Sequence, residues 1–170
     1  GKYNLEKLAR IPVEVVLASE FRYCDPIIDS RTLVVVISQS GETLDTMAAL
    51  REAKSLGARI VSIVKVVGSS IARESDDVLY TWAGPEIAVA TTKAYSTQMA
   101  VLDLLAIYLA GQRKTITAED MRRLTSAIAA LPAQVEQILS NREQIQYYAS
   151  QYFNHDSVFF IGRNLDYALG

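Results

Sequence analysis

Apolar positions along the chain follow two alternating patterns, one typical of strands and one typical of helices. Short runs of β-branched and other apolar residues predict strands, and longer segments with apolar residues every three or four positions predict helices. The predicted strands cover residues 32–37, 59–67 and 77–83, and the main helices cover residues 41–56 and 89–111. This alternation predicts an α/β fold, a three-layer sandwich whose mostly parallel sheet is flanked by helices.

The two ends of the chain predict further elements. Residues 1–10 have helical periodicity, and the apolar residues 13–18 are expected to form a short strand. Residues 117–154 have a helical pattern with a break at Pro132, because proline lacks the N–H group that a helix interior needs. The apolar residues 157–162 predict a last strand.

One strand runs directly into the letters SQSGET, after which a helical pattern begins. We expect Ser40 to be the N-cap of that helix, which leaves the backbone N–H groups of Gly41, Glu42 and Thr43 without intrahelical partners. A dianionic phosphate could accept hydrogen bonds from these groups, and the helix dipole would favour its charge. A cap needs one hydroxyl group, and this loop has three, on Ser38, Ser40 and Thr43. The density of donors therefore predicts a phosphate site rather than a cap alone.

Open parallel sheets bind ligands at the carboxyl ends of their strands. This rule selects residues 38–43, 65–70 and 84–92, with a fourth place at residues 162–164. A nucleotide-binding P-loop would need Gly-Lys-Ser or Gly-Lys-Thr, and a dinucleotide site would need G-x-G-x-x-G. The sequence contains neither motif. A serine-hydrolase elbow around Ser40 would need glycine two positions away on either side, where serine and glutamate stand.

Composition and charge exclude several other classes of function. The 17 basic and 19 acidic residues give a net charge of -2 without a basic cluster, so we expect no nucleic-acid partner. Cys24 is the only cysteine and His155 the only histidine, so we expect neither a metal site nor a disulfide, and a reducing cytoplasm is the simplest location. The longest apolar segment, residues 99–110, is interrupted by Asp103 and is too short to cross a membrane.

The letters ISQSGETLDT and VVGSSIARESDDVLYTWAGPEIAVATTKAYSTQ resemble the sugar-isomerase (SIS) domain of the glutamine–fructose-6-phosphate aminotransferase family, the glucosamine-6-phosphate synthases. The resemblance covers nearly the whole chain and implies a flavodoxin-like sheet. It also implies that the chain binds a hexose 6-phosphate and needs no cofactor. The substrate-binding residues that it implies are Ser38, Gln39, Ser40, Gly41 and Thr43 for the phosphate, and Val89 and Thr91 for the sugar. Thr91 stands where the family usually has serine and keeps the hydroxyl group.

The family converts fructose 6-phosphate and glutamine to glucosamine 6-phosphate and glutamate. Its isomerase lysine, glutamate and histidine correspond to positions beyond Gly170, so the resemblance implies no catalytic residue here and an inactive isolated chain. Neither Lys93 nor His155 is expected to replace them, and we assign no role to Lys65 or Trp82. An alternative is a non-catalytic SIS regulatory module that senses a sugar phosphate.

The resemblance also predicts how the chain is organised. Residues 1–154 correspond to a first SIS domain without its initial strand, and residues 155–170 to the opening strand and loop of a second. We hypothesise that residues 157–161 fill the vacant strand position, because an unfilled position leaves an unpaired sheet edge. This could occur within one chain or between two chains by strand swapping, and we expect a homodimer.

Overall fold

The computed structural model describes residues 1–87, 91, 93–159 and 161–163. These residues form two compact units. The first unit contains residues 1–2 and 12–105, and the second contains residues 3–11 and 106–170.

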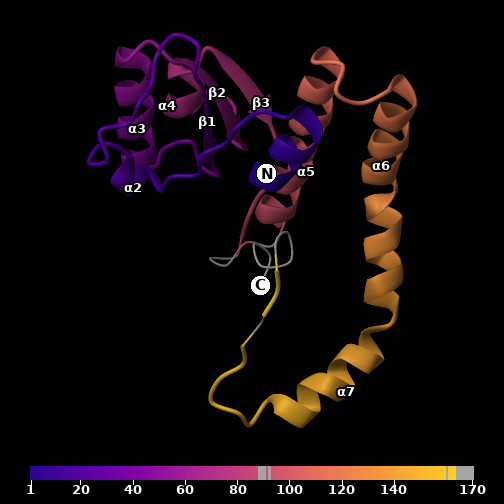
Figure 1. Ribbon diagram of the computed structural model, residues 1–170. Helices are drawn as coiled ribbons and strands as arrows, with labels where there is room; N and C mark the ends of the chain where they lie inside the picture. The colour runs from indigo at the N-terminus through magenta and orange to yellow at the C-terminus, as the bar shows by residue number, and fades with distance from the viewer. Residues whose placement is uncertain (88–90, 92, 160, 164–170) are drawn as a thin grey trace. The chain divides into compact units, whose positions relative to one another are not determined.

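Three parallel strands form the sheet of the first unit, in the order β1-β2-β3 (Figure 1). They are β1 Leu33–Ser38, β2 Arg59–Val64 and β3 Asp77–Tyr80. The register places Val36 beside Ser62 and Ser62 beside Val78. The three central predicted strands and their parallel arrangement are therefore confirmed, although β1 is shifted by one residue and β2 and β3 each end three residues earlier than predicted.

Two helices cover one face of this sheet, α3 Leu44–Ser55 and α4 Ser70–Glu74. Leu50 on α3 and Ile71 on α4 are fully buried and share a core cluster with Ile60 and Val64 of β2. α3 ends before Gly57, whose φ of 92° suits the residue that closes a helix. This packing fixes where the loops that follow β1 and β2 begin and end.

The short strand predicted at residues 13–18 is wrong. Residues 13–17 have no regular structure, and α2 Ala18–Phe21 follows them and contacts α3. Val15 and Leu17 are 72% and 73% exposed, so this apolar run has neither a core to face nor a strand to pair with. β-branched residues favour a strand only where such neighbours exist.

The second unit is helical in its described part. It contains the π-helix η1 Leu5–Ala9, which continues the short helix α1 Lys2–Asn4, and the long helices α6 Ala118–Ser140 and α7 Arg142–Tyr152. The helix α5 Lys93–Gln112 runs through both units. A capping box of Thr117 and Asp120 begins α6.

The predicted helix break at Pro132 is wrong, because α6 continues through it and ends at Ser140. Pro132 lies in an exposed part of the helix, where water can bond the carbonyl group that proline leaves without a donor. Of the predicted last strand, the described residues 157–159, 161 and 162 have no strand conformation. Residue 160 lies outside the described residues, and the hypothesis that this segment completes a sheet stays a prediction.

Candidate functional site

The carboxyl ends of β1, β2 and β3 lie at the same edge of the sheet, because the strands are parallel and in register. The three segments predicted to bind a ligand, residues 38–43, 65–70 and 84–92, lie at or after these strand ends. We call residues 38–43 the first loop, residues 65–71 the second loop and residues 81–92 the third loop. The core contacts of α3 and α4 hold the first two loops side by side.

The first loop is shaped by its own serines and threonine. The Oγ of Ser38 accepts a hydrogen bond of 3.0 Å from the backbone N–H of Gly41, and it lies 3.1 Å from the Oγ1 of Thr43. The Oγ of Ser40 accepts a bond of 3.2 Å from the N–H of Glu42. Ser38 is only 6% exposed, whereas Ser40 and Thr43 lie at the surface. The loop therefore combines one buried hydroxyl group with two that face solvent.

The structure corrects the expected start of the helix. α3 begins at Leu44 with Thr43 as its N-cap, not at Gly41 with Ser40 as its N-cap. Gly41 has a φ of 70°, which a right-handed helix cannot contain, so the helix starts only after the chain has turned. We expected the N–H groups of Gly41 and Glu42 to be free, but both donate to serine side-chain oxygens.

The first turn of α3 still offers donors to an anion. The side chain of Thr43 makes no capping hydrogen bond, and the first N–H groups of a helix have no intrahelical partners. Of the two protons carried by the hydroxyl groups of Ser38 and Thr43, one is used between them. The pair can therefore give one hydroxyl proton to a ligand without breaking its own bond.

The second loop braces the first. The N–H of Lys65 donates to the carbonyl of Gln39 at 3.2 Å, and the N–H of Ile71 donates to the carbonyl of Gly41 at 3.0 Å. The N–H of Ser70 donates to the carboxylate of Glu42 at 2.8 Å. This backbone bond lowers the pKa of the Glu42 carboxyl, and the side chain of Ser70 and the charge of Arg73 lower it further. The carboxylate therefore stays ionised at neutral pH.

Ser69 also supports the first loop, a role that the sequence, which only placed it within residues 65–70, did not predict. A Cβ atom at Gly41 would lie 2.1 Å from the Oγ and 2.5 Å from the Cβ of Ser69, so only glycine permits this approach. Ser69 is 3% exposed, and its Oγ has no hydrogen-bond partner in the described part of the chain. Its sequence signal was its position in the segment between a strand and the following helix.

The third loop contains the expected sugar-contacting residues. Thr91 is half-buried, donates its hydroxyl hydrogen bond to the carboxylate of Glu86 and accepts one of 3.2 Å from the N–H of Ala94. The Nζ of Lys93 donates to the carbonyl of Pro85. Thr91 is thus held by its own loop and by the first turn of α5, and Val89 lies outside the described residues. Trp82 is 79% exposed beside the ring of Tyr80.

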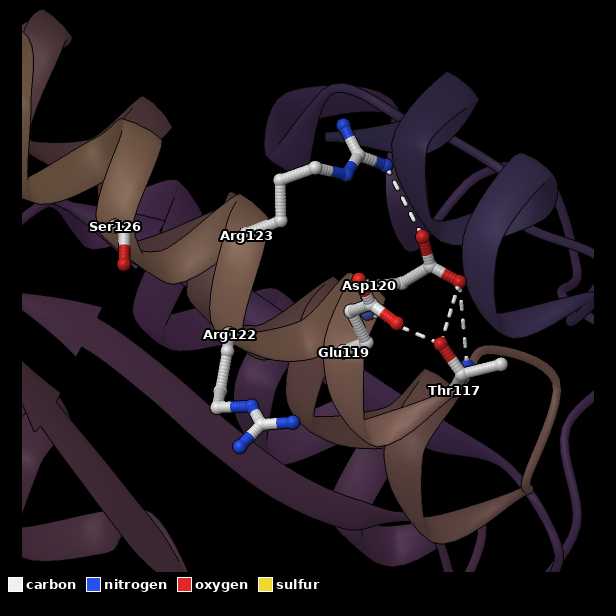
Figure 2. A pocket seen from close by; sticks show the side chains of 6 residues that line it. All are labelled: Thr117, Glu119, Asp120, Arg122, Arg123 and Ser126. Carbon is white, nitrogen blue, oxygen red and sulfur yellow. Dashed lines mark hydrogen bonds and ion pairs between the residues drawn. The ribbon is translucent and has the colours of Figure 1, made fainter.

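A separate hollow lies at the start of α6 and has a volume of about 590 Å³ (Figure 2). Figure 2 shows that Asp120 points to Thr117 and is also reached by Arg123, so these side chains serve the capping box and an ion pair. We assign no function to this hollow. Within the described ranges, no group of three histidine, cysteine or acidic residues could hold a metal ion, and no helix is long and apolar enough to cross a membrane.

The chain is similar to a known domain family and to enzymes that contain it. The profile described as SIS domain matches residues 1–108, more than half of the chain. Curated relatives named glutamine–fructose-6-phosphate aminotransferase [isomerizing] come from Clostridium acetobutylicum and Symbiobacterium thermophilum. They are 53% and 57% identical over 169 residues. These matches cover 99% of this chain but only 28% of each relative, so the chain spans little more than a quarter of their length.

A solved structure gives the same result. The C-terminal domain of glucosamine-fructose-6-phosphate aminotransferase from Francisella tularensis matches with a TM-score of 0.91 and 36% identity. The match covers 95% of this chain and 46% of that one. With the profile match over residues 1–108, these findings identify the chain as a member of the SIS domain family.

Proposed function

We propose that this chain is the phosphosugar-binding part of a glutamine–fructose-6-phosphate aminotransferase, and that it binds a hexose 6-phosphate without converting it. The observation that supports this most is the geometry of the first loop directly before α3, in which the hydroxyl groups of Ser38 and Thr43 lie 3.1 Å apart and that of Ser40 accepts from the N–H of Glu42. The identity of 53–57% to aminotransferases of that name favours this function over a regulatory SIS module.

The donors of the first loop suit a phosphate monoester. Hydrogen bonds to a charged group contribute about 1.5–3 kcal/mol each, and a helix dipole contributes about 0.3–1 kcal/mol. Three or four such bonds, less the cost of immobilising the ligand, correspond to roughly micromolar to millimolar affinity. Gln39 and Gly41 serve this site through their backbone, because their carbonyl groups fasten the loop to its neighbour.

The sugar end of the ligand is assigned to Val89 and Thr91. The half-buried hydroxyl group of Thr91 is held between Glu86 and Ala94, which gives it a fixed direction. Lys93 is not assigned a catalytic role, because its ammonium group is bonded to the carbonyl of Pro85 and lies 4.0 Å from the carboxylate of Glu86. We therefore expect only background turnover of fructose 6-phosphate and ammonia.

We also propose that the chain acts in the cytoplasm as a homodimer. Support comes from the long helices of the second unit, which have no buried residue and expose apolar side chains, among them Ile138, Leu139, Tyr147 and Tyr152. Such surface is typical of interfaces between subunits. Residues 157–161 would complete a sheet within one chain or in the partner, and their described apolar side chains are exposed.

A ligand titration tests the phosphate assignment. Fructose 6-phosphate is expected to shift the amide resonances of residues 38–46, and fructose without phosphate is expected to leave them in place. The reason is that the donors of the first loop and of the first turn of α3 face the phosphate group rather than the sugar. If fructose 6-phosphate moves no resonance between Ser38 and Thr43, the assignment is wrong.

Thr43→Val should weaken the binding of fructose 6-phosphate about tenfold, the equivalent of one hydrogen bond to a charged group. The loss is limited because Ser38 keeps its bond to Gly41 and can then give its own proton to the ligand. Isothermal titration measures the Kd, and Thr43→Ser is the control, because it keeps the hydroxyl group and should bind as the unchanged chain does. An unchanged Kd in Thr43→Val would contradict the assignment.

A further inference from the structure

Glu42 places a negative charge inside the loop that is proposed to bind a phosphate dianion. The residue lies between Gly41 and Thr43, and its side chain is exposed. Like charges repel, so the carboxylate by itself should weaken phosphate binding. A second, favourable effect of Glu42 on the site would have to offset this repulsion. The contacts of its carboxylate indicate what that is.

The carboxylate of Glu42 is used as a link between the first and the second loop. Its Oε1 accepts the hydrogen bond from Ser70, which lies 28 residues further along the chain. The bonds from Lys65 to Gln39 and from Ile71 to Gly41 join only backbone groups. Glu42 is thus the side chain of the first loop that bonds the backbone of the second.

The packing of Gly41 shows why such a link matters. Gly41 lies directly against Ser69, but the buried Oγ of Ser69 has no hydrogen-bond partner among the described residues. The close contact therefore contributes packing and no polar bond. Glycine is also the residue whose backbone moves most freely, so the loop needs bonds on either side of it to keep one shape.

We propose that Glu42 is a positioning residue for phosphate binding, whose carboxylate fastens the first loop to Ser70 and so holds the hydroxyl groups of Ser38, Ser40 and Thr43 together. The proposal rests on the phosphate-binding function proposed above. It assigns to Glu42 no contact with the ligand. The lowered pKa of its carboxyl agrees with this role, because an ionised oxygen that accepts a backbone hydrogen bond is a stronger acceptor than a neutral one.

Two substitutions separate the position of the oxygen from its charge. Glu42→Asp keeps the negative charge but shortens the side chain by one methylene group, so the carboxylate no longer reaches Ser70. Glu42→Gln removes the charge but keeps an oxygen at the same distance. If Glu42 positions the loop, Glu42→Asp should raise the Kd for fructose 6-phosphate about tenfold, and Glu42→Gln should change it by less than about threefold.

Asp45→Asn is the matched control for charge, because Asp45 is an acid in the first turn of α3, three residues further along. It should leave the Kd unchanged or lower it, since it removes a negative charge without cutting the link to Ser70. If Glu42→Asp binds as tightly as the unchanged chain, or if Glu42→Gln weakens binding as much as Glu42→Asp does, the proposal is overturned.

Amide hydrogen exchange without ligand tests the link independently of phosphate binding. The N–H of Ser70 should exchange faster in Glu42→Asp than in Glu42→Gln, while the amides of the buried strand β2 stay protected. Equal exchange in the two variants overturns the proposal whatever the Kd values are. If the unchanged chain does not bind fructose 6-phosphate, the proposed function fails, and the role of Glu42 in phosphate binding fails with it even where the exchange rates differ.

Discussion

Gly41→Ala is expected to destabilise the first unit by about 2–5 kcal/mol and to abolish measurable binding of fructose 6-phosphate. Two costs add. The backbone of Gly41 is left-handed, with a φ of 70°, which costs an alanine about 1–2 kcal/mol. The new methyl group would also overlap Ser69, and such overpacking costs about 1–3 kcal/mol.

The second cost cannot be avoided by rotating one side chain. The Oγ of Ser69 could turn away, but its Cβ would lie 2.5 Å from the new methyl group and is fixed to the backbone. Either the first or the second loop must therefore move. Because the bonds of Ser38 and Thr43 depend on the turn at Gly41, the proposed phosphate donors would move with it.

Gly68→Ala is the matched control for Gly41→Ala. Gly68 has a φ of 74°, nearly that of Gly41, but nothing lies within 4 Å of the position its Cβ would take. Gly68→Ala should therefore lower the free energy of unfolding only by the cost of the left-handed backbone, about 1–2 kcal/mol. Urea unfolding measures both free energies, and the contact with Ser69 would be unimportant if the two variants were equally stable.

Ser38→Ala is expected to weaken the binding of fructose 6-phosphate about a hundredfold and to lower the free energy of unfolding by about 1–3 kcal/mol. The loss of stability follows because the buried N–H of Gly41 loses its acceptor, and an unpaired buried donor keeps its full desolvation cost. The loss of affinity is larger than for Thr43→Val, since the variant loses both a donor and the bond that shapes the turn.

Ser40→Ala serves as the comparison for Ser38→Ala. The Oγ of Ser40 accepts from the N–H of Glu42 at the surface, where water can replace it, so stability should change by less than about 0.5 kcal/mol. Binding should still weaken, because a hydroxyl donor is lost. If Ser40→Ala were as unstable as Ser38→Ala, the prediction that the buried hydrogen bond contributes more to stability than the exposed one would be wrong.

Sequence predicted the sheet well, because each of the three strands is an apolar run bounded by polar residues. It failed where neighbours rather than local residues decide the structure. Residues 13–17 have strand composition but no strand beside them, and Pro132 costs α6 too little at the surface to end the helix. The start of α3 was placed too early because the left-handed turn at Gly41 could not be distinguished from a first helical residue.

The hydroxyl groups of the candidate site are evident in the sequence, but the contacts that support them are not. The hydroxyl groups of Ser38, Ser40 and Thr43 follow a strand in sequence, which is a local signal. The contacts from Ser69 and Ser70 to Gly41 and Glu42 join residues about 28 positions apart. They exist because β1 and β2 are adjacent and parallel, a fact of topology that no short motif contains.

The first loop contains no lysine and no arginine. Its donors are neutral hydroxyl and amide groups, whose attraction for an anion decays more steeply with distance than that of a full charge. Dissolved salt weakens the long-range attraction between full charges. It weakens hydrogen bonds from neutral groups much less, because they act only at contact distance. If the loop binds a phosphate as proposed, it should select it by the fit of the oxygen atoms rather than by net charge, and ionic strength should affect the Kd less than in a site built from basic side chains.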